Sequence, residues 1–255
     1  MAKIITIANQ KGGSSKTTTA VNLACAIAAT RRRVLLVDLD PQGSATVALS
    51  AQRSESGNCM AGCLIADMDV KSVIRRYNPG NFDLIPSSDD LTAVPVAFYG
   101  DADGELKLKN VLANIADDYD FIFLDTPPSL NLLTINALCA SDYLLIPMPC
   151  EFFALDSLNA IVDLFDRLNA TDRSHIELLG IVRVLFEENE SFSEQISLEL
   201  KKQFTNLLFD SVIPFSPRLA ECASIGRPVM LYDKSSQGAR AYLSLAGELF
   251  RRLGS

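Results

Sequence analysis

Short apolar runs recur along the chain, separated by longer stretches in which apolar residues follow a helical spacing. Several runs are almost wholly apolar rather than alternating, as expected for strands that are covered on both faces. The predicted strands are 3–8, 34–39, 82–86, 121–125, 143–148, 178–186 and 210–214. The predicted helices are about 16–30, 105–117, 130–140, 154–170, 191–204 and 237–253. Strands and helices that alternate over a whole chain indicate a parallel sheet with helices on both faces.

The fold class that this pattern predicts is α/β, with a doubly wound, mostly parallel sheet. We find no internal repeat, low-complexity tract or linker in the 255 residues, and therefore expect one domain over 1–255. Residues 51–80 are the least periodic segment and are expected to form a small helical insertion with loops. No apolar run reaches the roughly 18–20 residues that span a bilayer. The N-terminus leads directly into a strand-like run without a signal peptide, which favours a cytoplasmic protein.

Charge and cysteine content narrow the function classes. The net charge is 23 − 31 = −8, which argues against nucleic-acid binding by the whole surface. The first 200 residues carry 15 − 27 = −12 and residues 201–255 carry 8 − 4 = +4, so any basic face is local. Six cysteines are scattered along a chain with one histidine, His175. Buried cytosolic thiols are therefore expected, rather than a zinc site, disulfides or histidine-dependent catalysis.

The strongest motif lies where the first predicted strand passes into the first predicted helix. Gly12 and Gly13 allow the backbone to curl and direct successive N–H groups at an anion, and the following helix adds its positive dipole end. Lys16 can reach the β- and γ-phosphates of a nucleotide, and Thr17 can offer its hydroxyl to Mg²⁺. This combination predicts a phosphate-binding loop. The other loop residues expected to contact nucleotide are Ser14, Ser15 and Thr18.

This loop resembles the deviant Walker-A motif, x-K-G-G-x-x-K-[ST], because Lys11 precedes the glycine pair and Gln10 replaces the usual first glycine. The resemblance extends over nearly the whole chain to the ParA/Soj chromosome- and plasmid-partitioning family of the MinD/ParA superfamily. It is carried by IANQKGG, VLLVDLDPQG, DFIFLDTPPSLNLLTINAL, CEFFALDSL, VIP…RLAE and GRPVMLYDKSSQGARAYLSLAGEL. The chain looks like the short chromosomal type, without an N-terminal DNA-binding extension.

The resemblance implies a P-loop NTPase fold, ATP and Mg²⁺ as cofactors, and specific residue roles. Lys11 would cross a dimer interface to the partner's nucleotide, and Asp40 would orient the attacking water. Asp125 ends an apolar run, as a Walker-B acid does, and would hold Mg²⁺ partly through water, together with Thr17 and Asp40. The implied catalytic residues are Lys11, Lys16, Asp40 and Asp125. The adenine would pack near Pro214 and Ser216.

Two departures from the family pattern bear on function. Ser15 stands where the family has glycine, so its Cβ either strains the loop or crowds the β-phosphate, or its hydroxyl donates a further hydrogen bond. Turnover could therefore be weak. Asn189 stands where the family has a DNA-contacting arginine, beside three acidic residues, while a second such arginine is retained as Arg218.

The function expected from the resemblance is an ATPase that forms an ATP-dependent homodimer and binds DNA non-specifically on the nucleoid. It would drive chromosome or plasmid partition, with a ParB/Spo0J-like partner protein stimulating hydrolysis. The candidate DNA contacts are Arg218, Lys201, Lys202, Arg240, Arg251 and Arg252.

Two alternatives remain open at this point. One is a catalytically degenerate, nucleotide-gated scaffold that has lost turnover through Ser15. The other is a membrane-surface ATPase of the MinD kind, which would use the amphipathic C-terminal helix. Because the chain stops two residues after that helix, we expect no stable membrane anchor.

Overall fold

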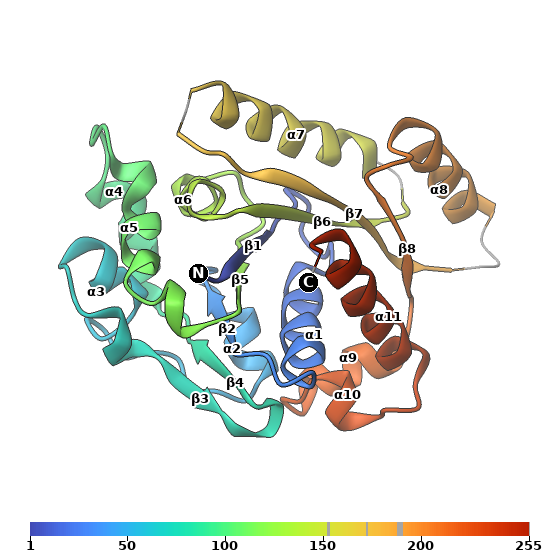
Figure 1. Ribbon diagram of the computed structural model, residues 1–255, viewed down its shortest axis with the longest axis horizontal. Coiled ribbons are helices and arrows are strands. Elements are labelled where there is room, and N and C mark those ends of the chain that lie inside the picture. Colours follow the sequence, from blue (N-terminus) through green and yellow to red (C-terminus); the bar gives the residue numbers. More distant parts are fainter. Residues whose placement is uncertain (152–153, 172, 188–190, 255) are drawn as a thin grey trace.

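The computed structural model describes residues 1–151, 154–171, 173–187 and 191–254 (Figure 1). These residues contain one eight-stranded sheet with the order β3-β4-β2-β5-β1-β6-β7-β8. Only β3 runs antiparallel to its neighbour, so the mostly parallel α/β fold is confirmed. The strands are β1 (Lys3–Ile7), β2 (Val34–Asp38), β3 (Arg75–Tyr77), β4 (Phe82–Ile85), β5 (Phe121–Asp125), β6 (Tyr143–Pro149), β7 (Glu177–Phe186) and β8 (Leu208–Pro214).

Helices cover both faces of the sheet (Figure 1). They are α1 (Lys16–Ala28), α2 (Ser44–Ala48), α3 (Met60–Ile65), α4 (Val94–Ala97), α5 (Lys107–Ala113), α6 (Leu132–Ala140), α7 (Ala154–Ala170), α8 (Ser191–Gln203), α9 (Pro217–Ser224), α10 (Val229–Tyr232) and α11 (Gln237–Arg252). On one face, α1 and α11 pack on the central strands in a cluster that includes Leu23, Phe123 and Tyr242. The other face is covered by two clusters, one under α3, α5 and α6 and one under α7.

The apolar runs predicted seven strands, and all seven are present with ends shifted by at most two residues. The elements that the pattern missed are short, namely α2, α4, α9, α10 and the edge strand β3. The insertion expected at 51–80 consists of α3, a 3₁₀ turn at 70–73 and β3. All six cysteines are buried and none forms a disulfide.

The C-terminal helix α11 is held to the sheet by polar contacts as well as by its apolar face. Glu248 accepts hydrogen bonds from the backbone N–H groups of Asp210 and Ser211, both at 2.9 Å. Arg252 pairs with Glu248 at 3.2 Å, and its guanidinium lies 3.8 Å from the centre of the Phe209 ring. The Arg252 guanidinium also donates hydrogen bonds to the carbonyls of Leu179, Leu207 and Leu208. This side chain is therefore part of the packing between α11 and the strands.

Arg252→Ala should lower the free energy of unfolding by roughly 2–4 kcal/mol, because it removes the ion pair to buried Glu248 and the hydrogen bonds to three backbone carbonyls. Arg251→Ala is the matched control, since Arg251 is exposed one position away, and its effect should stay within about 0.5 kcal/mol. Urea unfolding followed by circular dichroism measures both. Equal effects of the two substitutions would contradict the structural role of Arg252.

Candidate nucleotide-binding site

The loop between β1 and α1 has the backbone of an anion-binding turn. Gly13 has φ 74°, a left-handed conformation that glycine adopts without steric cost. Ser15, the residue before α1, has φ 59°, so a residue with a Cβ occupies a conformation that costs about 1–2 kcal/mol for L-amino acids. Glycine would adopt this conformation without strain. The expected effect of Ser15 is therefore backbone strain in the loop.

Lys16 is 7% exposed and lies inside the loop. Its Nζ donates hydrogen bonds to the Lys11 carbonyl at 3.2 Å and to Ser14 Oγ at 3.4 Å. Burial lowers the pKa of Lys16, while the charges of Asp125 and Asp40 act in the opposite direction. The cation is thus held at the end of the sheet that also carries the acidic residues.

Asp125 ends β5 and is fully buried. Its Oδ2 accepts a hydrogen bond from Thr17 Oγ1 at 2.8 Å, whereas its Oδ1 is buried without a hydrogen-bond partner. Burial, followed by the charge of neighbouring Asp38, raises the pKa of Asp125 well above its usual range. Thr17, Lys16 and Asp125, which sequence analysis assigned to one site, therefore lie together.

Asp38, to which the sequence assigned no role, lies beside Asp125 in the same site. It is paired in register with Asp125 across β2 and β5 and is fully buried. Its carboxylate accepts hydrogen bonds from the Thr46 backbone N–H at 2.8 Å and the Thr46 hydroxyl at 2.6 Å. Because Thr46 lies in the first turn of α2, Asp38 fixes the start of that helix. Burial raises the pKa of Asp38 to about 6 even though these hydrogen bonds favour its ionised form.

Asp40 lies two residues beyond β2 and is 6% exposed. Its Oδ1 accepts a hydrogen bond from the Gln42 backbone N–H at 2.9 Å, which closes a tight turn. The Ser87 hydroxyl, from the segment after β4, donates to the Asp40 carbonyl. The carboxylate is thus carried on a loop that is anchored from a distant part of the chain.

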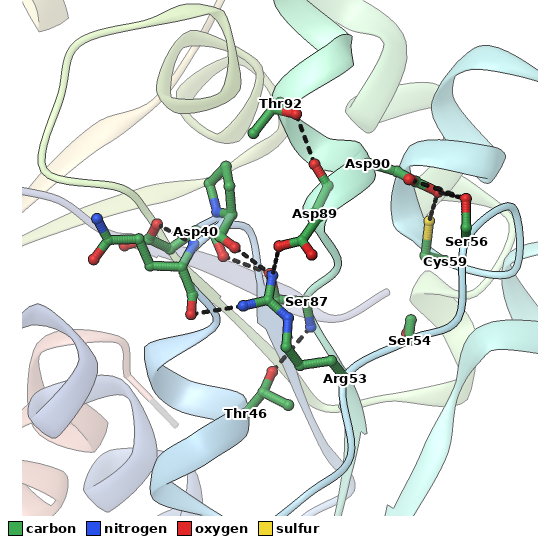
Figure 2. Close-up of polar contacts among 12 residues, drawn as sticks. Asp40, Thr46, Arg53, Ser54, Ser56, Cys59, Ser87, Asp89, Asp90 and Thr92 are labelled. Carbon is green, nitrogen blue, oxygen red and sulfur yellow. Dashed lines mark hydrogen bonds and ion pairs between the residues drawn. The ribbon is translucent and has the colours of Figure 1, made fainter.

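Arg53 provides the second anchor of this loop, as Figure 2 shows. Its Nη1 donates to the carbonyl of Gln42 at 2.9 Å, and its Nη2 donates to the carbonyl of Pro41. The same guanidinium pairs with Asp89 at 2.8 Å. No local motif marks Arg53 or Ser87, because their contacts to this loop span 11 to 47 positions of sequence. Both are positioning residues for Asp40.

Lys11 leaves the loop in a different direction from Lys16. Its Nζ forms an ion pair with Glu151 at 3.0 Å, just beyond the end of β6. The Lys11 side chain remains 28% exposed. The two lysines of the motif therefore have different surroundings, one buried among the acids and one at the surface.

A pocket of about 490 Å³ opens beside the loop. Gly12, Gly13 and Thr18 line the end formed by the loop between β1 and α1, together with the loop residues described above, and Asp40 borders it. Its far end is formed by the end of β7, by α9 and by the turn after α9, namely Leu185, Leu219, Cys222, Ala223 and Arg227. Pro214 and Ser216, which were expected near the adenine, lie at the end of β8 and just before α9, and they do not line this pocket.

The donor set suits a Mg²⁺ ion bound with a nucleotide. The unpartnered Asp125 Oδ1, the Thr17 hydroxyl and the Asp40 carboxylate supply hard oxygen ligands around one end of the pocket. An additional cation there would also offset the repulsion between Asp38 and Asp125. The residues present therefore fit the metal.

The candidate DNA contacts are distributed over three helices. Arg218, on α9, forms ion pairs with Glu221 at 2.7 Å and Asp233 at 3.8 Å, so its charge is partly offset. Lys201 and Lys202 are exposed on α8, which Figure 1 places at the opposite end of β8 from α9.

On α11, Arg240 and Arg251 are exposed. Arg252 is a correction: its guanidinium is taken up by carbonyls and Glu248, so it is not available to DNA. Asn189 lies outside the described residues.

Comparison with known proteins identifies the family. Residues 2–178 match the family model described as an AAA domain. The sporulation initiation inhibitor protein Soj of Bacillus subtilis is 39% identical over 249 residues, covering 98% of each chain. The chain belongs to the ParA/Soj family. The chromosome partitioning protein ParA of Myxococcus xanthus is 36% identical, over 99% of this chain and 89% of its own length. Among solved structures, the cobyrinic acid a,c-diamide synthase of Mycobacterium smegmatis, crystallised with an ATP analogue and magnesium, matches with a TM-score of 0.87 and 28% identity, covering 100% and 97% of the two chains.

Ser15→Gly should raise the free energy of unfolding by about 0.5–1 kcal/mol, because it removes a left-handed conformation that disfavours a Cβ. Ser44→Gly is the control: Ser44 borders the same pocket but lies in ordinary helix, so this change should destabilise by about 0.5–1 kcal/mol. Urea unfolding without nucleotide measures both. The relaxed Ser15→Gly loop should also bind ATP more tightly or turn it over faster. A Ser15→Gly variant less stable than the parent would refute the strain at Ser15.

Asp125→Asn should stabilise the nucleotide-free protein at pH 8 by on the order of 1–2 kcal/mol, because it removes a buried charge beside Asp38. In the parent, both carboxyls have pKa values raised above those of the unfolded chain, so the folded state binds protons more tightly. Stability of the parent should therefore rise as pH falls from 8 towards about 5.5, and this rise should be smaller in the variant.

The control for this pH profile is Asp163→Asn, a change at an exposed position of α7. It should leave the slope between pH 8 and 5.5 unchanged. Thermal unfolding across that range measures all three proteins, and parallel profiles of parent and Asp125→Asn would contradict the buried-pair explanation.

Proposed function

We propose that this chain is a partition ATPase that binds ATP with Mg²⁺, closes into a homodimer and binds DNA without sequence preference. A ParB/Spo0J-like partner protein stimulates hydrolysis and resets the cycle. The observation that carries the proposal is the meeting of Lys16, Thr17 and Asp125 at the phosphate end of a pocket bordered by Asp40. The name of the Myxococcus xanthus relative, chromosome partitioning protein ParA, supports the partition role.

Each residue of the site has a task in this proposal. Backbone N–H groups of the loop and Lys16 bind the β- and γ-phosphates, while Thr17 and Asp125 hold the metal. Mg²⁺, when bound, neutralises the charge that develops on the phosphate oxygens. Asp40 orients the attacking water on a loop that Arg53 and Ser87 keep in place. Lys11 exchanges its ion pair with Glu151 for the nucleotide of the partner subunit.

The two alternative functions have less support. Lys11, Lys16, Thr17, Asp40 and Asp125 are all present, as a working site requires, which argues against a degenerate scaffold. A MinD-like membrane role would require the apolar side of α11 to face lipid. Its side chains Tyr242, Leu245 and Leu249 are instead buried against the sheet. Within the described residues, no helix combines the length and hydropathy needed to cross a bilayer.

Asp40→Ala should lower ATP turnover at least 100-fold while ATP affinity changes less than about fivefold, because water positioning acts mainly on the transition state. Arg53→Ala should lower kcat roughly 10-fold with a small change in KM, since it frees the loop that carries Asp40. Arg32→Ala, at an exposed arginine outside the site, is the control. Steady-state turnover and nucleotide titration separate these effects. Turnover at the parent level in Asp40→Ala would overturn its assignment.

Lys11→Ala should leave a folded monomer that still binds ATP through Lys16 but no longer dimerises. Light scattering after size exclusion, with ATP and with ADP, measures the oligomeric state. Glu151→Gln is the informative companion, because it frees Lys11 from its ion pair and should favour the ATP-bound dimer. ATP-dependent, salt-sensitive DNA binding should follow dimer formation in each variant. Dimerisation of Lys11→Ala at the parent's ATP concentration would exclude the cross-subunit role.

A further inference from the structure

A second concave surface lies next to the nucleotide pocket, and we refer to it as the arginine groove. It has a volume of about 550 Å³ and lies between the end of α2, the edge strand β3 and the turn between α9 and α10. These elements lie together at one end of the sheet in Figure 1. The Tyr77 hydroxyl of β3 donates a hydrogen bond to the Gly226 carbonyl of the turn at 3.2 Å, which joins two walls of the groove.

The rim of the arginine groove carries three guanidinium groups, those of Arg75, Arg76 and Arg227, and none of the described residues that line it is acidic. Arg75 donates one hydrogen bond to the carbonyl of Gln52 at 2.9 Å, which leaves most of its donors available. Arg76 pairs with Asp83 at 3.0 Å, outside the lining, and its side chain is still 47% exposed. In a chain of net charge −8, this local reversal of charge favours an anionic ligand.

The lining of the arginine groove also includes apolar side chains. Ile225, which is 50% exposed, and exposed Pro79 supply the accessible apolar surface, whereas Leu49 and Leu84, each 2% exposed, form a closed floor beneath it. An exposed apolar surface with a charged rim is typical of protein-binding sites, where an apolar anchor is buried and polar groups surround it. A phosphodiester backbone matches the arginines but offers little apolar surface to bury here. An acidic peptide with an aliphatic or aromatic residue matches both.

We propose that the arginine groove binds a short acidic segment of a partner protein, whose apolar side chain contacts Ile225 and Pro79. Carboxylates on either side of that anchor pair with Arg75, Arg76 and Arg227. The inference rests on the proposed function in one respect, namely that the partner protein distinguishes the ATP-bound from the ADP-bound form of this chain.

The arginine groove shares a wall with the nucleotide pocket, which gives the proposed segment a route to the ATP site. Arg227 lines both cavities, and its backbone N–H donates to the carbonyl of Cys222 at 3.0 Å. Next to Arg227, Gly226 (φ 69°) packs closely against Ser50 in the lining of the groove, where a Cβ on the glycine would lie 1.7 Å from the serine Oγ. Because Arg227 belongs to both cavities, we expect the segment to bind with different affinities in the ATP and ADP states.

The experiment is a selection of random nonapeptides displayed on phage against the full chain, once with Mg-ATP and once with Mg-ADP. Enriched peptides are synthesised with a fluorophore, and their affinities are measured by anisotropy. The variants are Arg76→Gln for the rim and Ile225→Ser for the apolar contact, with Arg32→Gln as the charge-matched control away from the groove. ATP turnover and DNA binding of each protein are measured on the same preparations.

We expect enriched peptides that combine acidic residues with an aliphatic or aromatic residue. Arg76→Gln and Ile225→Ser should each weaken their binding at least tenfold, while Arg32→Gln should stay within twofold of the parent. Absence of enrichment, enrichment without acidic residues, or equal binding by all variants would overturn the proposal. A drop in the salt dependence of DNA binding in Arg76→Gln alone, without any peptide selected, would identify a DNA-contacting surface instead. Absence of ATP turnover and DNA binding in the unmodified protein would contradict the proposed function, independently of whether peptides bind to the groove.

Discussion

Two carboxylates, Asp38 and Asp125, occupy paired positions at the ends of neighbouring parallel strands, and the arrangement of the nucleotide site depends on holding them there. Their burial next to each other is unfavourable, and the surrounding residues compensate only in part. Thr46 satisfies the first carboxylate and thereby sets the start of α2, whereas Thr17 satisfies one oxygen of the second. Lys16 supplies a single cation to the group. The fold thus holds two buried carboxylates beside a single lysine, and the pKa of each carboxyl is raised as a result.

This electrostatic arrangement accounts for the features of the surrounding loops. A site with excess negative charge needs backbone N–H groups aimed inward to accept an anionic nucleotide, which the turn through Gly13 and Ser15 provides. In such a site the third carboxylate, Asp40, must also be held in place, because the charge of Lys16 attracts it. Arg53 and Ser87 do this through backbone carbonyls, which leaves the Asp40 carboxylate itself available.

The sequence predicted the parallel sheet well, because strands covered on both faces have nearly continuous apolar runs. The phosphate loop was equally recognisable, since its glycines, lysine and threonine are adjacent in the chain. Arg53, Ser87 and Thr46 escaped notice because each acts on a residue far away in sequence, through a contact that only the fold creates. The strand β3 was missed for a different reason: it has three residues, two of them arginine, and no apolar period. Arg252 was identified as a charge, but its spacing on α11 could not reveal that it reaches strand carbonyls.

The burial of all six thiols has a practical meaning for the study of this protein. Burial raises the pKa of Cys25, Cys63, Cys139 and Cys150 to about 11, so their reactive thiolate forms are scarce at neutral pH. The chain therefore has a low chemical background towards maleimide reagents while it is folded. A single cysteine placed on the exposed surface, for example at Ser235, would accept a fluorophore selectively without prior removal of the native thiols. The native thiols would react only when the surrounding core opens, so their labelling rates would report opening of the three core clusters that contain them.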